Sequence, residues 1–104
     1  MNTHLDKKIK ELLESIDSFS KLEIRLECPL NSGIKVTISG VKNNEVFFPK
    51  IPNGIKAFFQ FVNEAKQQRE KFNVVLIDIN ADRTYKTTFL YDEELQKTAD
   101  ENVK

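Results

Sequence analysis

Two short segments in which apolar and polar residues alternate constrain the fold of this chain most. The apolar side chains are Leu22, Ile24, Leu26 and Cys28 in residues 21–28, and Ile34, Val36 and Ile38 in residues 34–39. A period of two is typical of strands with one buried face, and the loop at residues 29–33 would join them as an antiparallel hairpin. Pairing Leu26 with Val36 and Ile24 with Ile38 gathers the apolar side chains on one face. The same register sets Glu27 opposite Lys35 on the other face.

Two segments with helical spacing would cover the apolar face of that hairpin. Residues 4–17 and residues 53–70 both repeat apolar side chains at intervals of three and four. The first stripe contains Leu5, Ile9, Leu12, Leu13 and Ile16, and the second contains Ile55, Phe58, Phe59, Val62 and Ala65. Phe61 falls outside the second stripe. Between the helices, residues 45–48 predict a short strand that Pro49 and Pro52 end.

The last third of the chain predicts a second hairpin, whose first strand is apolar on both faces. A loop at residues 81–83 gives three core-side pairs: Ile79 with Tyr85, Ile77 with Thr87, and Val75 with Phe89. The outer pairs are Asp78 with Lys86, Leu76 with Thr88, and Val74 with Leu90. Because the loop has no glycine, we expect Asp82 to take the left-handed conformation that such loops need.

These elements predict an α+β fold in the order α-β-β-β-α-β-β. About five strands would form an antiparallel sheet, with two amphipathic helices on one face. The length of 104 residues fits a single domain over residues 1–104. We expect a short terminal helix to begin at Asp92, and residues 96–104 to form a flexible tail.

The composition argues against several classes of function. Sixteen Lys and Arg balance sixteen Asp and Glu, whereas phosphate contacts need a basic surplus, so direct binding to nucleic acid is not predicted. No run approaches the ~20 apolar residues of a membrane span, and no signal peptide is recognisable, so we expect a cytoplasmic protein without membrane contact. His4 and Cys28 have no neighbours for nucleophilic or metal chemistry. We therefore predict no catalysis, no metal and no cofactor.

The outer face of the last hairpin offers an apolar strip with a polar rim. Small monomers seldom leave contiguous apolar patches uncovered. Either the C-terminal segment folds over the strip through Leu95 and Val103, or a partner protein binds there. The strip and the acidic groups around it form the predicted partner-binding set: Glu23, Glu27, Val74, Leu76, Asp78, Leu90, Asp92, Glu93 and Glu94.

The same hairpin resembles the YezG-like immunity family, small bacterial proteins that neutralise a toxin encoded beside them. The resemblance is carried by Phe72-Asn73, the apolar strand 74–79, the turn Asp82-Arg83, the strand 85–89 and the ending Tyr91-Asp92. It implies an antitoxin-like protein that binds and occludes a cognate toxin, such as a nuclease toxin domain. The family has no fixed toxin-contacting motif, so the predicted set rests on the surface argument.

Three alternatives stay open at this point. A structural or adaptor domain would act through homodimerisation, using the same strip or an edge strand. A module that binds a small ligand or nucleic acid would use the basic stretch Lys50–Lys71. An enzyme would need a composite site made by oligomerisation, because one chain shows no set of convergent catalytic groups.

Overall fold

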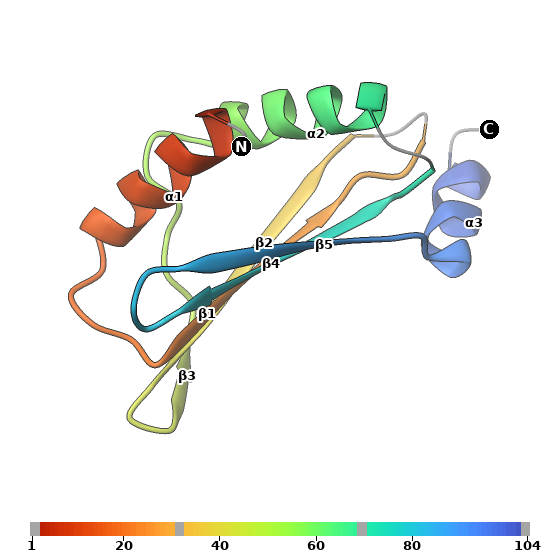
Figure 1. Ribbon diagram of the computed structural model, residues 1–104. Helices are drawn as coiled ribbons and strands as arrows, with labels where there is room; N and C mark the ends of the chain where they lie inside the picture. The colour runs from red at the N-terminus through yellow and green to blue at the C-terminus, as the bar shows by residue number, and fades with distance from the viewer. Residues whose placement is uncertain (1–2, 31–32, 69–70, 103–104) are drawn as a thin grey trace.

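The computed structural model describes residues 3–30, 33–68 and 71–102 (Figure 1). The helices are α1 (Thr3–Glu14), α2 (Lys56–Gln68) and α3 (Glu93–Asn102). The strands are β1 (Lys21–Glu27), β2 (Lys35–Lys42), β3 (Glu45–Phe47), β4 (Val74–Asn80) and β5 (Tyr85–Leu90). They form a five-stranded antiparallel sheet with helices, which confirms the predicted α+β class.

The strand order in the sheet is β3-β2-β1-β4-β5, so β1 lies at the centre and β3 and β5 are the edges. The β1–β2 pairing sets Ile24 opposite Ile38, and the β4–β5 pairing sets Val75 opposite Phe89, as the sequence predicted. The pairing of β1 with β4 sets Ile24 opposite Ile77. This central contact joins the two hairpins into one sheet.

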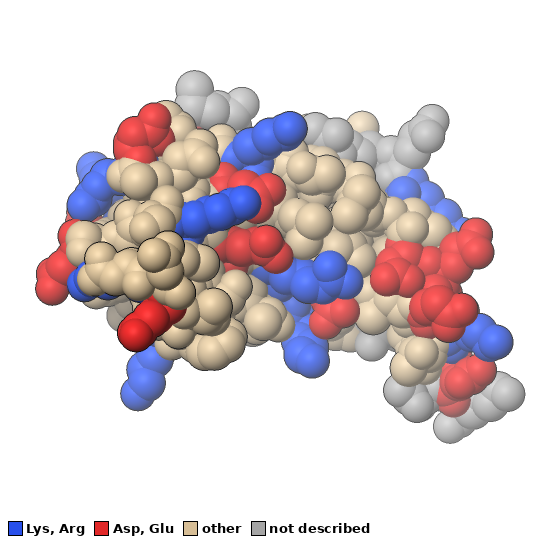
Figure 2. Space-filling model, turned by 90° about the horizontal axis from the view of Figure 1, so that it is seen from below, with Lys and Arg blue, Asp and Glu red and all other residues tan. Residues whose placement is uncertain are grey.

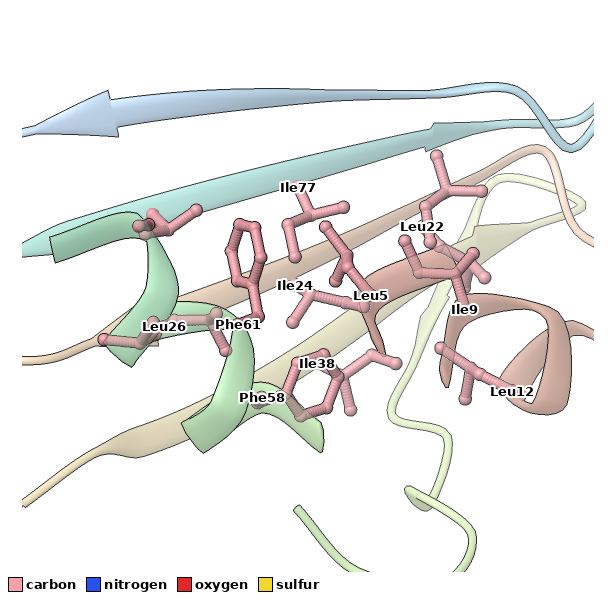
Figure 3. Packing of buried hydrophobic residues seen from close by; sticks show 14 of the residues in the cluster. Leu5, Ile9, Leu12, Leu22, Ile24, Leu26, Ile38, Phe58, Phe61 and Ile77 are labelled. Atoms are coloured by element: carbon pink, nitrogen blue, oxygen red, sulfur yellow. The ribbon is translucent and has the colours of Figure 1, made fainter. Parts of the chain in front are cut away.

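Helices α1 and α2 lie over one face of the sheet, and their apolar stripes pack against it (Figure 1). Figure 3 shows Leu5 of α1 and Phe61 of α2 beside Ile24 and Ile77 of the two central strands. Burying one such side chain fully contributes about 1.5–3 kcal/mol. Apolar packing therefore holds α1 and α2 on this face of the sheet. Neither helix covers the other face.

The rotation of α2 about its axis differs from the prediction at two phenylalanines. Phe61, expected outside the stripe, is 5% exposed, whereas Phe59, expected inside it, is 38% exposed. Two overlapping stripes share Phe58 and Val62, and both follow helical spacing. The sheet selects the stripe with Phe61, because Phe89 of β5 lies under α2 with its ring centroid 6.1 Å from that of Phe61.

The β4–β5 loop has its left-handed residue one position later than predicted. Arg83, not Asp82, has a positive φ, of 72°. The Arg83 N–H donates to the Asn80 carbonyl (2.9 Å) and the Asn80 N–H donates to the Thr84 carbonyl (2.8 Å), which is typical of a three-residue hairpin loop. Asp82 stabilises the loop by accepting hydrogen bonds from the hydroxyl (2.6 Å) and backbone N–H (3.0 Å) of Thr84.

The C-terminal segment is helical well beyond the short turn that we predicted. Residues 96–102, expected to be a flexible tail, continue α3, and Gln96 and Ala99 are buried. Asp92 caps the helix, since its Oδ1 accepts the backbone N–H of Leu95 (3.1 Å). Val103, expected to cover the apolar strip, lies outside the described residues.

Candidate protein-binding surface

The face of the sheet that α1 and α2 leave open carries rows of polar and charged side chains (Figure 2). Across one row, Glu23 of β1 lies opposite Asp78 of β4, which lies opposite Lys86 of β5. Figure 2 shows charges of both signs over the middle of this face and acidic side chains gathered at the end where α3 lies. One end of the open face is therefore distinctly acidic.

At the acidic end, an open groove of about 500 Å³ runs beside the start of α3. Its lining combines apolar, aromatic and charged side chains: Arg25, Val74, Leu90, Tyr91, Asp92, Glu93 and Glu94. Val74 and Leu90 lie opposite each other on β4 and β5. Val74 is almost fully buried, whereas Leu90 is 44% exposed. The structure thus brings the apolar pair and the acidic turn of the predicted set together.

Two buried carboxamides fix the position of α3 beside this groove. The Asn73 side chain donates from Nδ2 to the Asp92 carbonyl (2.8 Å) and accepts the Asp92 N–H at Oδ1 (2.7 Å). Gln96 holds Leu30 in the same way, accepting its N–H at Oε1 (2.8 Å) and donating from Nε2 to its carbonyl (3.1 Å). Since both contacts are bidentate, they restrain the direction of α3 as well as its distance from the sheet.

The three acidic residues at the start of α3 differ in what they offer a partner. The carboxylate of Asp92 already accepts the backbone N–H of Leu95 and therefore has a structural role. Glu93 and Glu94 are exposed residues that line the groove. The positive end of the helix stabilises negative charge at these positions, so a dense acidic turn is tolerated here without a partner.

The rest of the predicted set lies on the open face outside the groove lining. Glu27 pairs with Arg25 (Nε–Oε2 3.6 Å), which brings it to the border of the groove. Leu76 is half-buried opposite Arg25. Glu23 and Asp78 lie farther along the strands, directly opposite each other. Like charges in opposite positions disfavour strand pairing, and Lys86 on the other side of Asp78 places a positive charge in the same row.

Arg25 and Tyr91 line the groove although the sequence reasoning did not assign them to the site. Arg25 stands between Glu23 and Glu27 on β1, so the alternation already placed it on the open face. The Nζ atom of Lys71 lies 4.5 Å from the centroid of the Tyr91 ring, a cation–π contact. Tyr91 could have been assigned to the site from the sequence, because it directly precedes the acidic turn Asp92–Glu94.

Several polar and charged side chains between α1 and α2 have partners within the chain. An open groove of about 240 Å³ there includes His4, Lys8 and Glu11 in its lining. His4 Nε2 lies 3.0 Å from Glu64 Oε1, and the buried Lys8 donates to Glu11 (3.1 Å) and to the carbonyl of Pro52. The hydrogen bond from Lys8 lowers the pKa of Glu11. His4, Lys8 and Glu11 therefore already have partners within the chain.

The core position of Cys28, predicted from the alternation in its strand, is confirmed. Burial raises the pKa of its thiol, which disfavours the reactive thiolate. In residues 3–30, 33–68 and 71–102, no three His, Cys, Asp or Glu side chains gather where they could hold a metal ion. No helix in the same ranges has the length and apolar character to cross a membrane.

No protein-family model matches this chain, and no curated protein matches it significantly in sequence. The resemblance to the YezG-like immunity family therefore stays a prediction.

Proposed function

We propose that this chain is a non-catalytic immunity protein that binds a cognate bacterial toxin in the cytoplasm and covers its active site. The observation that supports this most directly is the groove beside α3, which joins the exposed Leu90 and Tyr91 to the acidic turn Asp92–Glu94. Aromatic and aliphatic side chains within a polar rim are typical of protein–protein interfaces. The family resemblance points to the same class of protein.

The charge of this end favours a partner with basic side chains. Glu93 and Glu94 line the groove, and Asp100 and Glu101 are also exposed along α3. A nuclease toxin domain contacts phosphates through Lys and Arg, and opposed charges speed the association of such surfaces and align them. Leu90 adds apolar area that a partner would bury. We infer that the cognate toxin acts on nucleic acid.

The test first recovers the partner and then measures whether the groove is needed to bind it. A tagged copy of the chain captures stoichiometric partners from the native host, and each recovered protein is expressed alone in a test strain. We expect one partner to stop growth by itself, and growth to return when the native chain is co-expressed. Leu90→Arg and the double substitution E93K/E94K should each weaken binding to that partner at least about tenfold.

Control substitutions on the side of the molecule that carries α1 and α2 show whether a loss of binding comes from the groove itself or from the change of charge alone. F59R and E14K/D17K make the same changes at exposed positions remote from the groove, and we expect them to leave binding and growth unchanged. If no captured partner is toxic, the immunity function is excluded. If growth is restored equally by the native chain and by the groove variants, the groove is not the docking site.

A further inference from the structure

The edge strand β3 and the residue that follows it carry the two most exposed large apolar side chains among the described residues. Phe48 is 73% exposed and Val46 is 64% exposed. They are two positions apart, at the edge of the sheet opposite to β5. A separate open hollow of about 580 Å³, with Ile16, Phe47 and Pro49 in its lining, lies on the helix side of the same edge. Exposed apolar side chains that lie close together on a surface mark an interaction site.

The geometry of β3 is fixed by its pairing with β2. Val46 lies opposite Val41, and Phe47 lies opposite Gly40. A Cβ atom at Gly40 would come within 2.7 Å of the Phe47 ring and 2.6 Å of Leu22 Cδ2, so the ring occupies the space that glycine leaves. Phe47 therefore faces the core. Because side chains alternate along a strand, Val46 faces the open side, and one more residue of strand would bring Phe48 to that side.

We propose that β3 is the seam of a symmetric homodimer, in which the β3 strands of two copies pair antiparallel at their free edges. A two-fold axis centred on Phe47 sets Val46 of each copy opposite Phe48 of the other. Centring the axis on Val46 would set Phe48 against Asn44, and centring it on Phe48 would set Val46 against Lys50. The other two axes give one apolar pair each, Val46 with Val46 or Phe48 with Phe48. Only the axis at Phe47 gives both exposed side chains of each copy an apolar partner, so this register is the favoured one.

The seam is short, so the dimer is weak and dissociates on dilution. β3 has three residues, Pro49 follows shortly after it, and short strands and prolines restrain pairing at a sheet edge. Interfaces smaller than the standard size form transient complexes. β5 and the groove beside α3 lie at the other edge of the sheet. The dimer is therefore independent of the proposed immunity function and leaves the groove of each copy accessible.

Sedimentation of the purified full chain from about 10 μM to about 1 mM tests the seam over the range expected for weak complexes. We expect the average mass to rise with concentration toward that of a dimer. V46K/F48K should stay monomeric with an unchanged circular-dichroism spectrum, whereas F59K, at an exposed position on α2, should dimerise like the native chain. A chain that is monomeric throughout, or a dimer that survives V46K/F48K, would overturn the proposal.

Disulfide trapping tests the register. Opposite residues on antiparallel strands have Cα atoms about 4.5–5.5 Å apart, within the reach of a disulfide. The native Cys28 is buried, so introduced cysteines are the reactive ones. Under mild oxidation, V46C/F48C should form a covalent dimer much faster than V46C alone, and A81C, in the β4–β5 loop, should form little. Equal rates for V46C alone and V46C/F48C would contradict the axis at Phe47.

Discussion

Asn73 and Gln96 each use one side-chain amide to satisfy both backbone groups of another residue. The backbone of Asn73 also joins its own segment to two others. Its carbonyl accepts the N–H of Cys28 (2.8 Å), and its N–H donates to the carbonyl of Leu90 (3.0 Å). Among the described residues, every buried side-chain nitrogen and oxygen atom has a hydrogen-bond partner. A buried polar group without a partner costs free energy, so these amides hold α3 only while both bonds are made.

Replacing Asn73 with Ala should lower the free energy of unfolding by about 2 kcal/mol, because the amide and carbonyl of Asp92 lose their partners at a fully buried site. Gln96→Ala should cost less, about 1 kcal/mol, because Leu30 is 36% exposed and water can replace the amide. Urea unfolding measures both values. Gln67→Ala, at an exposed position on α2, is the control, and a cost for Asn73→Ala no larger than that of the control would refute this role.

The carboxyl of Asp82 makes the contribution of the β4–β5 loop to folding stability depend on pH. Hydrogen bonds from the hydroxyl and then the backbone N–H of Thr84 lower the pKa of its carboxyl. A carboxyl with a lowered pKa in the folded state favours folding above its unfolded pKa, and this contribution is lost as pH falls through the folded pKa. We expect an NMR titration to place Asp82 below the ordinary value of about 3.9.

The variant Thr84→Val separates the two hydrogen bonds, because it removes the hydroxyl and keeps the backbone N–H. The pKa of Asp82 should then rise part of the way toward its ordinary value. An unchanged midpoint in this variant would show that the hydroxyl bond does not form in solution.

At the scale of elements, the sequence predicted the two hairpins in full register but not the rotation of α2. Alternation fixes which side of a strand is buried, because a slip of one residue exchanges its faces. A helix has no such constraint, and a stripe with Phe59 and a stripe with Phe61 fit the same spacing. The choice depends on Phe89 of a distant strand. The length of α3 was missed because its anchors are amides, which leave no apolar periodicity in the sequence.

The rotation of α2 predicts unequal costs for two similar substitutions. Phe61→Ala should lower the free energy of unfolding by about 3 kcal/mol, because it removes a buried ring and leaves a cavity beside Phe89. Phe59→Ala should cost less than about 1 kcal/mol, since its ring is largely on the surface. Urea unfolding of both variants measures the difference. Equal costs would mean that α2 is rotated as the sequence alone suggested.

At the scale of the whole molecule, the balanced charge of the chain conceals an uneven distribution. The acidic residues of α3 gather at the end of the sheet near β5 (Figure 2), whereas β3, with its apolar side chains, forms the opposite edge. Of the groove residues, the sequence predicted Val74, Leu90 and the acidic turn Asp92–Glu94 but not Tyr91, which directly precedes that turn. It placed Glu23 and Glu27 beside the apolar strip but omitted Arg25, which stands between them, because a basic side chain did not fit the acidic surface that was expected.

The strand order also determines when the sheet can form during synthesis of the chain. Because β1 pairs with β2 on one side and with β4 on the other, the centre of the sheet cannot close until Val74–Asn80 has been synthesised. At the roughly 5–20 residues that a ribosome adds each second, β1 waits several seconds with one edge unpaired. Unpaired strand edges promote aggregation of nascent chains. We therefore expect the yield of folded protein in a cell to depend on the speed of translation between β1 and β4.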